Sequence, residues 1–127
     1  MVFIDKSSGK PYYEQLMLGI KEEIVSGILK PGDQLLSVRE MSRELTMNPN
    51  TVSKAYKLLE AQDVIITVKG KGTFVKALTT EMDPKSVEKI QRQLSELTIE
   101  AYYQNISSEE LKRWVEDSYK KIKGEHT

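Results

Sequence analysis

The stretch NPNTVSKAYKLLE, residues 48–60, carries a concentration of side chains that can form hydrogen bonds or carry charge. At helical spacing its apolar residues share one face. The opposite face carries Asn50, Thr51, Ser53, Lys54 and Lys57. Asparagine and lysine at the exposed start of a helix can pair with adenine, guanine or phosphate. The same face is also compatible with an ordinary solvated surface, so its meaning depends on the elements around it.

Enzymatic and metal-binding chemistry has little support in the residues. The chain contains no cysteine, which excludes disulfides and thiolate metal sites, and its single histidine, His126, lies beside the C-terminus, where we expect no ligand role. The segment Gly70-Lys71-Gly72 is too short for a dinucleotide-binding glycine motif. No nucleophile, base and orienting group converge. We therefore expect no catalytic residues, no metal, no cofactor and no enzyme activity.

Composition and charge set limits on the partner. The 127 residues, of which 39% are hydrophobic, suffice for one compact domain with an appendage. The net charge of zero argues by itself against a nucleic-acid partner. However, residues 48–76 carry 5 Lys against 2 Asp and Glu, so positive charge gathers around the polar stretch. No segment approaches the roughly 20 apolar residues of a membrane span, and we expect a cytoplasmic protein with no membrane partner.

Helical patterns precede and include the polar stretch. Apolar residues recur at helical spacing over residues 13–24. The sequence SVRE, residues 37–40, has the spacing of a capping box, which predicts a second helix over residues 38–45. Two residues later, Asn48 and Pro49 provide a preferred N-cap followed by a proline at the first helical position. Two short helices joined by so tight a turn form a helix-turn-helix.

A β-hairpin is predicted after the polar helix. Residues 64–68, VIITV, are mostly β-branched, and residues 73–75 resume an extended pattern after the basic tip KGKG. The connector ILKPGDQLL, residues 28–36, could include a short strand. Three helices followed by a hairpin form a winged helix-turn-helix. The predicted fold class is mainly α with a small β-hairpin, and residues 1–77 are predicted to be an N-terminal winged helix-turn-helix DNA-binding domain.

Residues 78–127 are predicted to be a linker followed by a helical hairpin. The apolar residues of its first helix fall at alternating steps of three and four, and they are Val87, Ile90, Leu94, Leu97 and Ala101. A second S-x-x-E sequence at residues 107–110 opens the next helix, whose apolar residues include Leu111, Trp114, Val115 and Ile122. Two amphipathic helices cannot bury both apolar faces within themselves, so we expect a second copy to cover them and this region to mediate dimerisation.

These motifs resemble the GntR family of bacterial transcription regulators, and within it the short YtrA-like branch. The resemblance spans nearly the whole chain. It is carried, in order, by PYYEQL at residues 11–16, SGILKPGDQLLSVREMSREL at 26–45, NPNTVSKAYKLLE at 48–60 and KGKGTFV at 69–75. Three backbone positions depart from the family's pattern, because Leu36 replaces a usual proline and Thr46 and Asp63 replace usual glycines. Aspartate tolerates the left-handed conformation better than most residues.

The resemblance implies which residues contact DNA. In the family an arginine just inside the second helix contacts the operator, and here this residue is Arg39. The recognition helix reads bases from its first turns, and the tip of the hairpin enters the minor groove. The candidate DNA-binding residues are accordingly Ser37, Arg39, Asn48, Asn50, Thr51, Ser53, Lys54, Lys57, Lys69, Lys71, Gly72 and Thr73. The short branch ends in a two-helix dimerisation tail without a large effector-binding domain.

The function that we expect is that of a homodimeric, sequence-specific DNA-binding transcriptional regulator, with double-stranded operator DNA and a second copy of itself as partners. We favour a repressor of its own or a neighbouring operon, because members of the short branch often regulate neighbouring transporter genes. A winged-helix adaptor that binds an acidic protein is the alternative. Aromatic residues such as Tyr13, Tyr56 and Trp114 are expected to pack rather than to stack on bases. The sequence identifies neither the operator nor any small-molecule effector.

Overall fold

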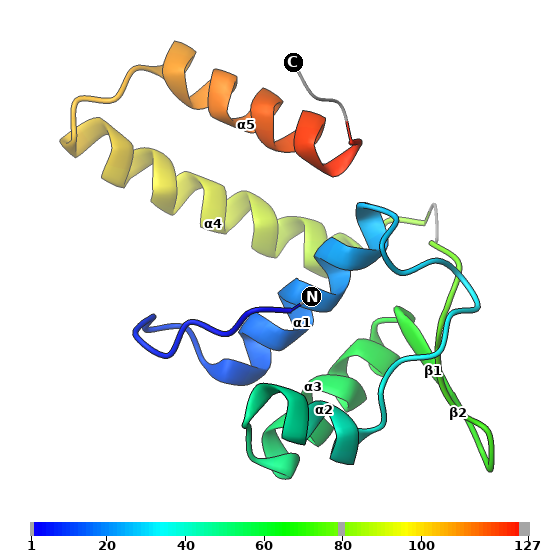
Figure 1. Ribbon diagram of the computed structural model, residues 1–127. Helices are drawn as coiled ribbons and strands as arrows, with labels where there is room; N and C mark the ends of the chain where they lie inside the picture. Colours follow the sequence, from blue (N-terminus) through cyan, green and yellow to red (C-terminus); the bar gives the residue numbers. More distant parts are fainter. Residues whose placement is uncertain (1, 79–80, 125–127) are drawn as a thin grey trace. The chain divides into compact units, whose positions relative to one another are not determined.

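The computed structural model describes residues 2–78 and 81–124, and His126 lies outside these described residues. In chain order they form α1 (Tyr12–Val25), α2 (Val38–Leu45), α3 (Pro49–Ala61), β1 (Ile65–Val68), β2 (Gly72–Val75), α4 (Pro84–Tyr103) and α5 (Ser108–Ile122) (Figure 1). The chain separates into two compact units, Met1–Leu78 and Thr79–Thr127. Helices with one small hairpin confirm the predicted fold class. Among the described residues, no helix is long and apolar enough to cross a membrane.

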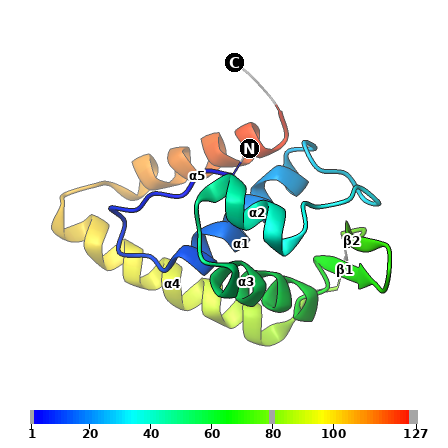
Figure 2. The same ribbon diagram turned by 60° about the horizontal axis from the view of Figure 1, so that its bottom comes forward.

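The first unit contains the hydrophobic core. Leu16 and Ile20 of α1 are fully buried, and they pack with Val52 and Leu59 of α3 and with Ile65 of β1. The four apolar residues of α3 at helical spacing, Val52, Ala55, Tyr56 and Leu59, are all buried. Figure 2 shows α1, α2 and α3 gathered together with the hairpin beside them. The inward face predicted for the polar helix is therefore confirmed, and its polar residues must point elsewhere.

The N-caps of α2 and α3 are formed by the predicted residues. Ser37 forms a complete capping box with Glu40 at the start of α2, and Asn48 caps α3 with Pro49 behind it. Thr46 ends α2 in the left-handed conformation, with φ of 51°. The Ser42 hydroxyl donates a 2.8 Å hydrogen bond to the Met47 carbonyl and closes the turn from inside. A buried side chain thus stabilises a turn in which a residue other than glycine has a positive φ.

The hairpin is an antiparallel pair in which Val68 lies opposite Gly72. The first strand begins one residue later than predicted, and the second begins one residue earlier. The connector before α2 also pairs with β2, because Leu35 donates to the Thr73 carbonyl at 2.8 Å and the Val75 amide donates to the Asp33 carbonyl at 2.9 Å. The short strand considered for this connector is thus reduced to an isolated bridge between residues 34 and 74.

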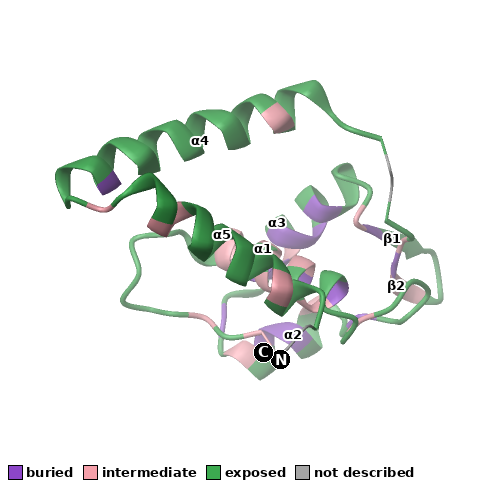
Figure 3. Cartoon of the chain, turned by 90° about the horizontal axis from the view of Figure 1, so that it is seen from above, coloured by how far each residue is buried: buried purple, intermediate pink, exposed green. Residues whose placement is uncertain are grey.

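The second unit consists of α4 and α5. Asp83 caps α4 and Pro84 follows it at the first helical position. Ser107 accepts the bond from the Glu110 amide at 3.2 Å, which is half of the capping box predicted there. The Glu110 carboxylate instead accepts a bond from Arg113 at 3.2 Å, one turn further along the exposed face of α5. Figure 3 shows the contrast between the units, because buried residues gather in the first unit whereas α4 and α5 are almost entirely exposed.

Candidate nucleic-acid interface

The polar residues of α3 lie on the side of the helix away from the core. Asn50, Lys54 and Lys57 are exposed, and Thr51 and Ser53 are half-buried beside them. Because the buried face of α3 is occupied by apolar residues, these five side chains form one continuous outward surface. It combines amide, hydroxyl and ammonium groups, which are the groups that read base edges and bind phosphate.

Asn48 is the N-cap of α3 and lies at the start of this surface. Its side-chain oxygen accepts a 2.8 Å hydrogen bond from the Asn50 amide and caps α3. The acceptor of the Asn48 side chain is therefore engaged within the protein, and its amide donors are the part suited to a DNA contact. The other amides of the first turn of α3 are engaged as well, because Pro49 has no N–H and the Thr51 amide donates to the Asn48 carbonyl at 3.0 Å.

Ser37 is similarly engaged, at the start of α2. Its hydroxyl accepts a 3.1 Å bond from the Glu40 amide, while the Ser37 amide donates to the Glu40 carboxylate at 2.9 Å. Two interactions with Ser37 hold the pKa of the Glu40 carboxyl below its ordinary value. The hydrogen bond from the Ser37 amide has the larger effect, and the interaction with the Ser37 side chain has the smaller one. This exchange fixes the first turn of α2, on which the exposed Arg39 stands.

A shallow groove between α2 and the start of α3 contains a second arginine that the sequence did not single out. Arg39 and Arg43, one helical turn apart on α2, both line it together with Ser42, Met47 and Pro49. Two guanidinium groups beside the first residue of α3 favour an anion at this place. The spacing of four residues between the two arginines could have indicated Arg43, but no sequence motif marks it.

The basic tip of the hairpin extends from the same unit. Lys69 and Lys71 are exposed, and Gly72 and Thr73 are half-buried. The Glu60 carboxylate accepts a 3.1 Å bond from the Thr67 amide, which ties β1 to the end of α3. The hairpin is thus attached to α3 by a side chain as well as by chain continuity. The remaining lysine of this region, Lys76, pairs with Asp63 at 3.2 Å.

Tyr13 contributes to the polar face as well as to the core. Its half-buried ring packs against the hydrophobic cluster, as expected, and the Lys54 ammonium lies 4.0 Å from the ring centroid. A cation over an aromatic face is attracted by the negative charge density of the ring. Periodicity placed Tyr13 on the apolar face of α1 correctly, but it carries no information about a contact with a residue of α3.

A buried tyrosine joins α3 to the connector. The Tyr56 hydroxyl donates a 2.6 Å hydrogen bond to the Leu36 carbonyl, one residue before the cap of α2. Burial of the ring, and then the charge of Glu40, raises the pKa of Tyr56, so the hydroxyl stays protonated and remains a donor. This bond fixes the start of α2 against α3, and it supports the expectation that Tyr56 packs.

The predicted dimerisation residues of the second unit are largely uncovered. On α4 Ala101 is buried and Val87 is half-buried, whereas Leu94 and Leu97 are 53% and 64% exposed. Leu111 of α5 is half-buried, and the exposed apolar residues of the tail also include Ile90, Trp114, Val115 and Ile122. Side chains of this size on one pair of helices form an apolar surface that water covers in the isolated chain.

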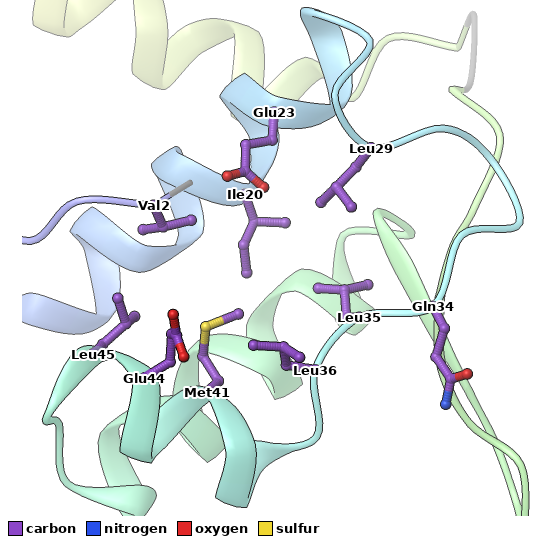
Figure 4. A pocket seen from close by; sticks show the side chains of 10 residues that line it. All are labelled: Val2, Ile20, Glu23, Leu29, Gln34, Leu35, Leu36, Met41, Glu44 and Leu45. Atoms are coloured by element: carbon purple, nitrogen blue, oxygen red, sulfur yellow. The ribbon is translucent and has the colours of Figure 1, made fainter.

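The part of the chain that the structure describes has no cluster of metal-binding side chains, and it contains an apolar cavity away from the polar face of α3. The described residues include no group of three or more His, Cys, Asp or Glu that could hold a metal ion. A cavity of about 330 Å³ lies between α1, α2 and the connector (Figure 4). It is lined mainly by apolar side chains such as Val2, Ile20 and Met41, with Glu23 and Glu44 among them. No nucleophile and base stand together in this lining.

Comparisons with known proteins agree with this geometry. Residues 12–75 match the family described as "Bacterial regulatory proteins, gntR family". The chain is 43% identical over 126 residues to the HTH-type transcriptional repressor YtrA of Bacillus subtilis (strain 168), covering 98% of this chain and 96% of the relative.

Two solved structures are also similar. A transcriptional antiterminator from Listeria monocytogenes EGD-e gives a TM-score of 0.87 at 41% identity and covers 96% of this chain and 92% of that chain. AraR(DBD) in complex with operator ORX1 gives a TM-score of 0.52 at 28% identity and covers 57% of this chain and 90% of that chain.

Proposed function

The chain belongs to the GntR family of bacterial regulatory proteins, and on this premise we propose that it is a homodimeric, sequence-specific DNA-binding repressor of transcription. The relative YtrA is described as a transcriptional repressor, and it matches the chain over nearly its whole length. Its relatives are transcriptional regulators, a class without enzymatic activity. A regulator of operator DNA acts in the cytoplasm.

The single observation that carries the proposal is the outward polar face of α3. Asn50 and Lys54 are exposed near the start of a helix whose opposite face is buried, so they are available to enter a major groove. A bidentate contact between such a side chain and a base contributes roughly 1–3 kcal/mol of discrimination against the wrong base. In this proposal α3 reads the sequence of the operator.

Two further parts of the first unit would hold α3 in register. Arg39 and Arg43 line the groove beside the start of α3 and would bind the phosphate backbone. Lys69 and Lys71 of the hairpin would bind phosphate and enter the adjacent minor groove. Phosphate contacts position a protein on the duplex, and base contacts select the sequence, so both kinds are needed for a specific site.

The second unit would join two copies. The exposed apolar residues of α4 and α5 need cover, and a second copy offers an identical surface with two-fold symmetry. Two recognition helices related by a two-fold axis bind inverted half-sites about one helical turn apart. Linking the two contacts raises the affinity for a full site without any new interaction, because the second contact becomes intramolecular.

The experiment begins with selection of duplexes by the full chain from a random-sequence pool, and the recovered sequence is called here the selected duplex. Binding is then measured on the selected duplex and on a random duplex of equal length over a series of salt concentrations. We expect an affinity for the selected duplex at least about 1,000-fold higher and a loss of affinity with salt on both. A pool that yields no preferred sequence contradicts the proposal, and binding to acidic proteins alone supports the adaptor.

A further inference from the structure

The tip of the hairpin is held by a side chain that does not belong to the hairpin. Gln34 lies in the connector between α1 and α2, and its amide Nε2 donates a 3.2 Å hydrogen bond to the carbonyl of Lys71 at the tip. Figure 4 shows the Gln34 side chain, one of those that line the cavity, directed along the strands of the hairpin. The contact joins residues 37 positions apart in the sequence.

Gly72 is shaped to receive this amide. Its φ of 126° is a conformation that residues with a side chain rarely adopt. A Cβ atom added at position 72 would also collide with Nε2 of Gln34. The positive φ accounts for a glycine at this position, and the missing side chain leaves room for the amide of Gln34 where it lies.

The backbone of the connector supports the same arrangement. Residue 34 is bridged to Phe74, and its neighbours Asp33 and Leu35 are both hydrogen-bonded to β2. Three residues after Gln34, Ser37 starts α2 and fixes the turn that carries Arg39. The segment from residue 33 to residue 37 is therefore attached to the hairpin at one end and to α2 at the other.

A hairpin of two four-residue strands with glycines at its tip is flexible unless other contacts hold it. A basic tip that moves freely loses conformational entropy when DNA fixes it, and this loss weakens binding. A hydrogen bond that orders the tip before DNA arrives removes part of that cost. Gln34 is in the right place to provide this order, because its bond ends on the carbonyl of Lys71 itself.

We propose that Gln34 is a positioning residue for DNA binding, which acts by holding Lys71 and the hairpin tip in the orientation that contacts the duplex. The inference rests on the proposed DNA-binding function and adds to it a residue that makes no DNA contact of its own. It assigns the connector a part in recognition beyond linking two helices.

Binding of the selected duplex tests this role through a double-mutant cycle of Gln34→Ala and Lys71→Ala in the full chain. One intramolecular hydrogen bond corresponds to about a two- to tenfold change in affinity, and we expect a loss of this size for Gln34→Ala. Because Gln34 acts through Lys71, it should cause little further loss once Lys71 is alanine. The matched control is Gln62→Ala, at the exposed end of α3, which should leave affinity unchanged.

Hydrogen exchange of the free protein supplies a readout without DNA. The Lys71 amide bonds to the Val68 carbonyl at 2.9 Å and closes the tip, so Gln34→Ala should speed exchange at Lys71. Exchange at the buried Ile65 and the melting temperature should stay as in the unaltered chain. A residue that only stabilised the fold would change both of these.

The outcomes separate the inference from the function on which it rests. If Lys71→Ala weakens binding while Gln34→Ala changes neither affinity nor exchange at the tip, the positioning role is wrong and the DNA-binding function stands. If the losses of the two variants simply add, Gln34 does not act through Lys71 and the inference is also overturned. If Gln34→Ala speeds exchange but Lys71→Ala binds every duplex normally, Lys71 has no part in DNA binding. The positioning role of Gln34 and the proposed DNA contact of Lys71 are then both contradicted.

Discussion

The ammonium group of Lys54 lies 4.0 Å from the centroid of the Tyr13 ring, so a cation–π contact connects the polar face of α3 to the start of α1. Lys54 is exposed and has a long flexible side chain, which without a partner samples many rotamers. A ring beneath its charged end restricts that freedom while leaving the ammonium accessible to a phosphate or base. Under the proposed function, Tyr13 should therefore affect DNA binding through Lys54.

The first prediction compares two substitutions of Tyr13. Tyr13→Leu removes the aromatic face and should weaken binding to the selected duplex by about 0.5–1 kcal/mol, whereas Tyr13→Phe keeps the ring and should bind like the unaltered chain. Titration by fluorescence anisotropy at fixed salt measures both. In a chain that already carries Lys54→Ala, Tyr13→Leu should have no effect, and an undiminished loss there would show that Tyr13 acts without Lys54.

The second prediction concerns the arginines of the groove. Arg39→Ala and Arg43→Ala should each weaken binding to the selected duplex, because each removes a cation that lies beside the start of α3. A residue that contacts only phosphate should weaken all duplexes alike and lower the slope of affinity against salt by about one. Arg92→Ala, on the exposed surface of α4, is the control. Unchanged affinity and salt slope in both groove variants would contradict the assignment.

The third prediction tests the tail. Leu94→Asp places a charge in the apolar surface of α4, where Leu94 is 53% exposed in the isolated chain. It should convert a dimer to a monomer in sedimentation and weaken binding to a full two-half-site duplex by about 100-fold or more, while leaving binding to one half-site unchanged. Deletion of residues 84–127 should act in the same way. Glu96→Ala, an exposed change on the same helix, should preserve the dimer. If the Leu94→Asp variant remains a dimer, the apolar surface of α4 does not mediate dimerisation.

The fourth prediction concerns the cap of α2. Ser37→Ala removes a hydroxyl that accepts the Glu40 amide, and it should lower the free energy of unfolding by about 1 kcal/mol. The bonds from Ser37 lower the pKa of Glu40 in the folded state, so the ionised carboxylate stabilises the fold above its unfolded pKa, and this stabilisation is lost as pH falls through the folded value. The difference in stability between the unaltered chain and Glu40→Gln should therefore shrink in acid. A difference that stays constant from neutral pH to acid would contradict this coupling.

Periodicity and capping rules predicted most of the fold. The bounds of α2, both caps of the helix-turn-helix and the four buried residues of α3 follow from local patterns, and the structure confirms them. The capping box at Ser107 is only half formed, because the spacing of two residues does not decide between alternative partners of Glu110 on an exposed helix. Local sequence determines which hydrogen bonds a side chain such as that of Glu110 can form, and the neighbouring side chains determine which of them it forms.

The candidate site was less completely predictable. Sequence reasoning identified the polar face of α3 and the basic hairpin tip, whose roles in DNA binding stay predictions. It missed Gln34, Arg43 and the link between Tyr13 and Lys54. Two of these depend on pairs of residues that are 37 and 41 positions apart, and no periodic pattern within one element reports such a contact.

Asn50→Ala tests the central claim, that the exposed face of α3 reads base sequence, most directly. Affinity is measured for the selected duplex and for a random duplex of equal length at one salt concentration, with Gln62→Ala as the control. A residue that reads a base should lose roughly 1–3 kcal/mol on the selected duplex and almost nothing on the random one. An equal loss on both duplexes, or no loss on either, would contradict the account that Asn50 and its neighbours on α3 select the operator.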